Sequence, residues 1–176
     1  MTSLQHPLSA FDSNRINAVG AHGVLRHTKI GLFCSSRCPG GPIVKAYDFA
    51  QFVSQSDVAI VSGFQSTIEK DCFEILLRGI SPAIVCPARR LSQSRVPREW
   101  QDAIGAGRML LLSPFNQKQK RATAELAVER NRFVASIADE ILIAYAHPGS
   151  KTEALCREFL ASASAFTPSM TRVTAT

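Results

Sequence analysis

The chain has 176 residues, 45% of them hydrophobic, and a formal net charge of +6, which suits one domain with a full core. No apolar run approaches the eighteen or so residues of a membrane span, and residues 1–24 lack the continuous apolar core of a signal peptide. We therefore expect a cytoplasmic protein that does not contact a membrane.

Residues 1–27 are polar and without periodicity, which predicts an extension with little regular structure beyond a short strand at Val24-Leu25. From 28 to 160, short apolar runs closed by Gly, Pro or Ser alternate with segments of helical spacing. The predicted strands are 29–34, 57–61, 82–86, 109–112 and 140–144, and the predicted helices are 43–54, 67–78, 99–104, 123–138 and 152–160. Residues 161–176 are small and polar and predict a loose C-terminal tail.

The residues at the two ends of the predicted helix 67–78 indicate how this helix is capped. Thr67 and Lys70 do not form a capping box, although Glu69 in the first turn suits the helix dipole. Gly79 fits a C-cap.

Short strands alternating with helices predict a mostly parallel sheet covered on both faces, which is a doubly wound, Rossmann-like α/β fold. In such sheets ligands bind outside the carboxyl ends of the strands. The polar loops that follow the predicted strands converge there: 35–41, 62–66, 87–97, 113–121 and 145–151.

The positive charge is concentrated in one segment. Residues 89–132 contain ten basic and four acidic side chains, so this segment carries the whole net charge and the rest of the chain is neutral. Such a block suits a polyanionic partner such as nucleic acid. The alternative is a solvated surface of a basic protein.

A small-residue turn, Gly149-Ser150-Lys151-Thr152, follows the last predicted strand and opens a helix. Free N–H groups at such a turn, together with the helix dipole, favour an anion. Ser62-Gly63 is a second turn of this kind, or merely a tight strand–helix connection. Ser36-Arg37 follows the first strand, where Arg37 either clamps a phosphate or is solvated.

Arg130 and Arg132 are about 200° apart on a helix. One is therefore expected to face the cleft while the other makes a structural or surface contact.

No catalytic set is recognisable. There is no G-x-G-x-x-G pattern, and a Walker motif fails because Ala144 stands where its first glycine would be. His147 is the only histidine in a converging loop, and paired carboxylates are absent. The five cysteines are scattered, and Cys34 and Cys38 have no second Cys/His pair with metal-ligand spacing. We expect neither a cofactor nor a metal, and a binding protein rather than an enzyme.

Together these motifs resemble the Rossmann-like domain of the DNA-processing protein A family (DprA/Smf), within the superfamily that also contains LOG enzymes. The resemblance runs from about Lys29 to Leu160, and Glu129-Arg130-Asn131-Arg132-Phe133-Val134 is its most specific part. It implies a basic pocket for single-stranded DNA phosphates, a homodimer, and a role in loading recombinase. The phosphate-pocket residues carried over are Ser36, Arg37, Ser62, Gly63, Arg130, Asn131 and Lys151, and the turn adds Gly149, Ser150 and Thr152.

The chain departs from the family pattern after Ser62-Gly63. The segment 65–69 and Phe73 replace the family's glycine, acid and histidine, which points to a different ligand preference. The winged-helix and helical domains that many members carry are not expected in this chain, so the recombinase-loading role does not follow from it.

Two other functions fit the same pocket. One is a sensor of a free nucleotide-derived ligand. The other is a LOG-type nucleoside monophosphate phosphoribohydrolase, whose motif partly resembles 148–153. Leu155 stands where that enzyme's catalytic glutamate is expected, which makes the hydrolase the weaker alternative.

Overall fold

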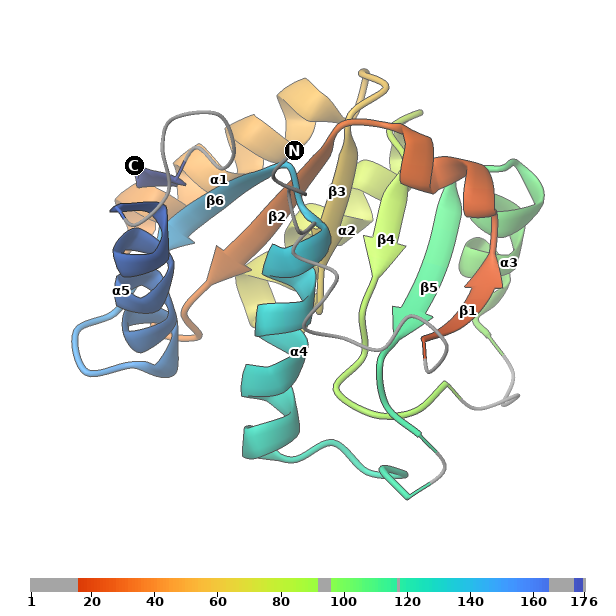
Figure 1. The fold of residues 1–176 in the computed structure, drawn as a ribbon. Coiled ribbons are helices and arrows are strands. Elements are labelled where there is room, and N and C mark those ends of the chain that lie inside the picture. The colour runs from red at the N-terminus through yellow and green to blue at the C-terminus, as the bar shows by residue number, and fades with distance from the viewer. Residues whose placement is uncertain (1–15, 92–95, 117, 165–172, 176) are drawn as a thin grey trace, which may run out of the picture.

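The computed structural model describes residues 16–91, 96–116, 118–164 and 173–175. They build a seven-stranded sheet with the order β1-β5-β4-β3-β2-β6-β7 (Figure 1). The strands are β1 (Asn17–Gly20), β2 (Lys29–Cys34), β3 (Ala59–Ser62), β4 (Ala83–Val85), β5 (Met109–Ser113), β6 (Glu140–Tyr145) and β7 (Val173–Ala175). All neighbouring strands are parallel except β1, which runs antiparallel to β5.

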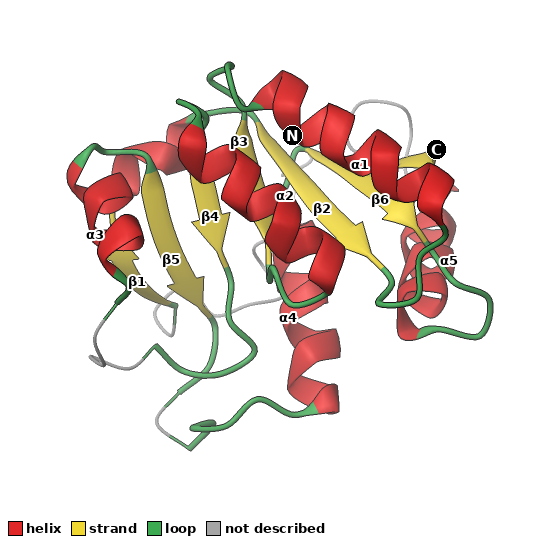
Figure 2. Ribbon diagram, turned by 180° about the vertical axis from the view of Figure 1, so that it is seen from behind, coloured by secondary structure: helices red, strands yellow, loops and turns green. Residues whose placement is uncertain are grey.

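Helices cover both faces of the sheet. On one face lie α1 (Gly40–Val53), α2 (Thr67–Arg78) and α3 (Arg98–Gly105), seen in front in Figure 2. On the other lie the 3-10 helix η3 (His22–Arg26), α4 (Ala124–Ile137) and α5 (Lys151–Ser164), as Figure 1 shows. Across the described residues, no helix combines the length and the apolar character needed to cross a membrane.

The apolar strands are buried from both sides. Successive side chains alternate between the two cores, so Ile60 packs toward α1 and α2 while Val61 packs toward α4. Leu111 and Leu110 divide in the same way. This is why the strands read as continuous apolar runs rather than as alternating patterns.

The predicted doubly wound fold is confirmed. Each of the five predicted strands and five predicted helices is present, with ends that differ by a few residues. The helix at 67–78 matches α2 at both ends.

Regular structure extends further in both directions than expected. β1 and η3 lie within residues 1–27, and Val24-Leu25, expected in a strand, belongs to η3. At the other end α5 continues to Ser164, and β7 lies within the predicted tail. Residues 1–15 of the predicted extension, and 165–172 and 176 of the predicted tail, lie outside the described residues.

The caps of α2 agree with the prediction, since Thr67 and Lys70 form no capping box and Gly79 is the C-cap. A capping box is present, but it pairs Ser66 with Glu69 and does not involve Thr67. The C-cap Gly79 has a φ of −94°. Glycine is required at position 79 because a Cβ there would collide with the carbonyl of Ser54.

Candidate functional site at the carboxyl ends of the strands

The strand order reverses between β2 and β6, and the loops that follow these two strands are tied together. The Ser35 hydroxyl lies 3.1 Å from that of Ser150 and accepts a hydrogen bond from the backbone N–H of His147 at 2.9 Å. The Ser35 N–H donates to the carbonyl of Tyr145 at 2.9 Å. Ser35 was not among the predicted site residues. Only the pairing of β2 with β6 shows that it joins two converging loops.

A buried carboxylate lies behind these loops. Glu69, in the first turn of α2, is 7% exposed. It accepts hydrogen bonds from the backbone N–H groups of Cys34 at 3.0 Å, Gln65 at 2.9 Å and Ser66 at 3.2 Å. Burial raises the pKa of this carboxyl, against the lowering effect of these N–H groups and of Arg130. Glu69 thereby joins the end of β2 to the β3–α2 loop.

The guanidinium of Arg130 joins α4 to the ends of β3 and β4. It is 4% exposed, and its Nη1 donates to the carbonyl of Cys86 at 3.0 Å. Nη2 donates to the side-chain oxygen of Gln65 at 3.3 Å, and Nε to that of Asn131 at 2.7 Å. Burial lowers the pKa of Arg130, while the charge of Glu69 raises it.

Gln65 stands between the two buried charges. Its backbone N–H donates to Glu69 and its side-chain oxygen accepts from Arg130. Three strand ends and two helices are therefore connected by one polar network. Such a network holds the carboxyl edge rigid when each of its members has a partner.

In the turn that precedes α5, a glutamate of the protein itself accepts a hydrogen bond from a backbone N–H group. Glu153 accepts a hydrogen bond from the Gly149 N–H at 2.7 Å, and the Ser150 hydroxyl accepts one from the Glu153 N–H at 3.1 Å. Hydrogen bonds, first from Gly149 and then from Arg157, lower the pKa of Glu153. The expectation of free N–H groups is therefore wrong for Gly149.

The two arginines of the Arg-Asn-Arg segment diverge as predicted. Arg132 is exposed and forms an ion pair with Glu158 of α5, with Nε and Oε1 2.8 Å apart. Arg130 faces the strand ends. It is a buried member of the framework rather than an open cation.

The other predicted site residues differ in exposure. Ser36, Arg37 and Lys151 are exposed and Thr152 is half-buried. Ser62 is buried, and its hydroxyl accepts the N–H of Phe64 at 3.2 Å. The predicted site therefore divides into exposed cations, Arg37 and Lys151, and buried polar residues such as Ser62 and Arg130, which are hydrogen-bonded within the protein.

The two basic loops contact each other beside the ends of β4 and β5. The Ser113 hydroxyl donates to the carbonyl of Arg89 at 2.8 Å, and the Arg90 N–H donates to the carbonyl of Gln119 at 2.9 Å. These loops carry four exposed cations: Arg89, Lys118, Lys120 and Arg121. Arg95 lies outside the described residues. The loops project below the sheet in Figure 1, beside the start of α4.

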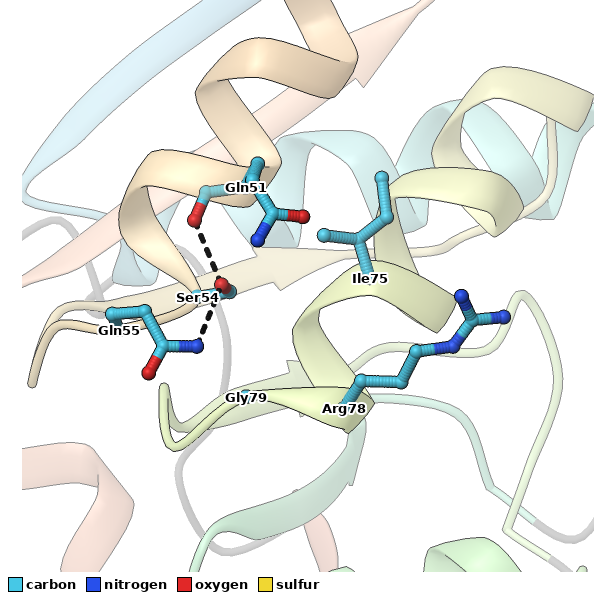
Figure 3. A pocket seen from close by; sticks show the side chains of 6 residues that line it. All are labelled: Gln51, Ser54, Gln55, Ile75, Arg78 and Gly79. Atoms are coloured by element: carbon cyan, nitrogen blue, oxygen red, sulfur yellow. Dashed lines mark hydrogen bonds between the residues drawn. The ribbon is translucent and has the colours of Figure 1, made fainter.

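A small hollow of about 160 Å³ lies at the opposite end of the sheet (Figure 3). It is formed between the C-terminal ends of α1 and α2, and its lining residues are Gln51, Ser54, Gln55, Ile75, Arg78 and Gly79. None of the predicted site residues lines it.

Comparison with known proteins decides the family. The sequence model of DNA recombination-mediator protein A matches residues 15–156, which is most of the chain. The chain belongs to this family. The resemblance predicted from the Arg-Asn-Arg segment is thereby confirmed.

Two solved structures are similar in fold to this chain. DNA processing protein A (DprA) from Streptococcus pneumoniae superposes with a TM-score of 0.73 and 18% identity, over 96% of this chain and 58% of that one. DprA from Helicobacter pylori, which binds single-stranded DNA, superposes with a TM-score of 0.67 and 16% identity, over 89% of this chain and 73% of that one. The chain thus spans less than two thirds of the pneumococcal structure. None of the curated proteins matches it.

Proposed function

We propose that this protein binds single-stranded DNA along the carboxyl edge of its sheet, through the phosphates. The observation that carries the proposal is the pair of joined basic loops, which hold Arg89, Lys118, Lys120 and Arg121 exposed at that edge. Membership of the recombination-mediator family supports it, as does the single-stranded DNA binding of the H. pylori protein.

Exposed and buried residues take different parts in this proposal. Arg37 is exposed on the loop after β2 and Lys151 is exposed at the start of α5, near the point between β2 and β6 where the strand order reverses, so they are placed to contact phosphates beside the basic loops. Arg130, Asn131 and Gly63 instead support the edge from the inside. The Arg130 guanidinium donates hydrogen bonds to the Cys86 carbonyl at the end of β4 and to the Asn131 side chain, and Gly63 leaves the space that it occupies. Phosphate contacts by exposed cations, on an edge held together by a polar network, suit binding without base readout.

An extended polyanion suits this edge better than a single phosphate does. Carboxylates of the protein itself occupy N–H groups at both strand–helix turns, Glu69 at the start of α2 and Glu153 at the start of α5. A free nucleotide would have to displace them, whereas a DNA strand can bind the outer cations. This weighs against the nucleotide sensor. The buried Leu155 weighs against the phosphoribohydrolase.

Salt dependence of binding tests the proposal. We expect a fluorescent oligothymidylate to bind the protein at low salt, with log affinity falling linearly against log salt concentration, because phosphate contacts release counterions. Unlabelled oligothymidylate should compete at far lower nucleotide concentration than nucleoside monophosphates do. The absence of oligonucleotide binding at low salt would overturn the proposal. Equal competition by mononucleotides would favour the sensor.

The remaining expectations need separate tests. The homodimer is a prediction that sedimentation equilibrium of the full chain can check. Cytoplasmic location is likewise a prediction, open to fractionation of cells.

A further inference from the structure

Two aromatic rings lie at the end of β6, beside the point where the strand order reverses. Tyr145 is the last residue of β6 and pairs with Cys34 at the end of β2, and the two strands lie side by side in Figure 2. The centroids of the Tyr145 and His147 rings are 6.3 Å apart, and the rings are inclined by 49°. Both residues are half-buried. In each of the other aromatic pairs of the described residues at least one ring is buried, so this pair differs from them in its access to solvent.

The polar atoms of both rings are open to water. Within the described residues, neither the Tyr145 hydroxyl nor the His147 ring nitrogens take part in a hydrogen bond, and no buried side-chain polar atom is without a partner. The hydroxyl and the ring nitrogens are therefore accessible to solvent. Tyr145 also packs against the core cluster under α1 and α2. A ring that is anchored on one side and exposed on the other can stack with a second flat ring.

One buried serine holds the backbone of both aromatic residues. The Ser35 N–H donates to the Tyr145 carbonyl, and the Ser35 hydroxyl accepts from the His147 N–H, both at 2.9 Å. The Ser150 N–H donates to the His147 carbonyl at 3.0 Å. Ser35 is 4% exposed, so its hydrogen bonds are shielded from water. The backbone that carries the two rings is thus fixed before a ligand binds, which reduces the entropy lost on binding.

Exposed cations lie on the two loops that meet at these rings. Arg37 follows Ser35 by two residues on the β2–α1 loop, and Lys151 opens α5 directly after Ser150. Proteins that bind single-stranded nucleic acid combine cations, which contact the phosphates, with aromatic side chains, on which the bases stack. Both kinds of group are present here, on neighbouring strand ends.

We propose that Tyr145 and His147 form a stacking subsite for a base of the bound DNA strand, at the reversal of strand order between β2 and β6. The subsite rests on the proposed function and deepens it. The cations of the edge hold the phosphates, and the two rings make a base contribute to affinity. Stacking uses the face of the base rather than its hydrogen-bonding edge, so it is tolerant of sequence.

Removal of the bases separates stacking from phosphate contacts. An oligothymidylate and an abasic oligomer of the same length carry the same phosphate charge. At one salt concentration we expect the wild-type protein to bind the thymidylate about 5- to 100-fold more tightly, which is the range for one stacked base. The double variant Tyr145→Leu, His147→Ala should lower this ratio by a similar factor. Partial unfolding of a variant weakens both oligomers alike and cancels in the ratio.

Two further variants serve as controls for the ratio. Tyr145→Phe keeps the ring and loses only a hydroxyl that has no hydrogen-bond partner among the described residues, so it should retain the ratio of the wild-type protein. Phe52→Ala removes a ring that is 81% exposed near the C-terminal end of α1, at the opposite end of the sheet, and should likewise leave the ratio unchanged.

Photocrosslinking locates the stacked base. Iodouracil in place of thymine crosslinks on irradiation to aromatic side chains beside it. Trypsin releases residues 133–151, which contain both rings, as one peptide, and residues 99–108, which contain Trp100, as another. We expect the crosslink in peptide 133–151, at Tyr145 or His147. A crosslink confined to the Trp100 peptide would overturn the assignment of the subsite.

The affinity ratios distinguish the subsite from the proposed function. Equal affinity of the wild-type protein for the thymidylate and for the abasic oligomer would overturn the subsite and leave phosphate binding intact. A ratio that is unchanged in the double variant would overturn the role of these two rings. If the wild-type protein binds neither oligomer at low salt, the proposed function falls and the subsite falls with it.

Discussion

The guanidinium of Arg130 occupies the space that a side chain at residue 63 would need. A Cβ on Gly63 would overlap Nη1 of Arg130, which is held in place by the carbonyl of Cys86. Gly63 is half-buried at the end of β3, and its φ is not left-handed. Glycine is therefore required at this position because the Arg130 guanidinium lies against its backbone, and not because of its φ.

Gly63→Ala is expected to destabilise the protein by about 1–3 kcal/mol, the usual cost of overpacking a buried site. The guanidinium cannot move aside without losing hydrogen bonds to Cys86 and Gln65. Urea denaturation measures the change. The control is Gly41→Ala in α1, where a Cβ meets nothing within 4 Å and Ala favours the helix. A Gly63→Ala midpoint equal to that of the wild-type protein would contradict the expected overlap.

Arg130 and Arg132 provide a matched pair on one helix. Arg130→Ala should cost about 3–5 kcal/mol, because it leaves the buried Glu69 without a nearby positive charge. Arg132→Ala removes a half-exposed ion pair with Glu158 and should cost about 0–1 kcal/mol. Urea unfolding of both variants makes the comparison. Similar losses in the two variants would show that the buried network contributes no more than a surface pair.

Glu69 should give stability a distinctive pH dependence. Burial raises its pKa in the folded protein above the ordinary value of 4.5, so between these two values the folded state binds more protons than the unfolded state. The contribution of Glu69 to stability is therefore fully present below 4.5 and is lost as pH rises through the raised value. We therefore expect the unfolding free energy of the wild-type protein to fall relative to that of Glu69→Gln as pH rises through this range. A difference that does not change with pH would contradict the raised pKa.

The outer cations should contribute to DNA affinity without contributing to stability. Lys151→Ala and Lys120→Ala should each weaken oligothymidylate binding and reduce the slope of log affinity against log salt by about 1. Arg78→Ala is the control, since Arg78 is also exposed but lies at the opposite end of the sheet beside the hollow of Figure 3. Equal effects of all three variants would indicate a response to net charge rather than a site at the carboxyl edge.

Periodicity was sufficient to predict the central elements. Strands buried on both faces, such as β5, are continuous apolar runs with Gly, Pro or Ser at their ends, and α2 has a clear apolar face. The divergence of Arg130 and Arg132 followed from helix geometry alone. Each of these signals is local, so a single stretch of sequence contains it.

The parts that were missed depend on partners distant in sequence. β1 has a weak strand pattern and is held by β5, whose paired residues lie 90 to 96 positions later. Glu69 reads as an ordinary first-turn acid, and its burial depends on the N–H of Cys34 at the end of another strand. The Ser35 bridge likewise needs β2 and β6 to be neighbours. Non-local pairing decides all three.

The direction of the two outermost strands determines where the chain enters and leaves the sheet. Because β1 is antiparallel to β5, its first residue, Asn17, lies opposite Ser113 at the carboxyl edge. β7 is parallel to β6 and ends beside Ile143, near the same edge. A purification tag or fluorophore attached ahead of β1 or after β7 is thus tethered at the margins of the proposed DNA-binding edge. Labels for binding measurements are better placed at the other end of the sheet, for example at Gln55 or Gly105.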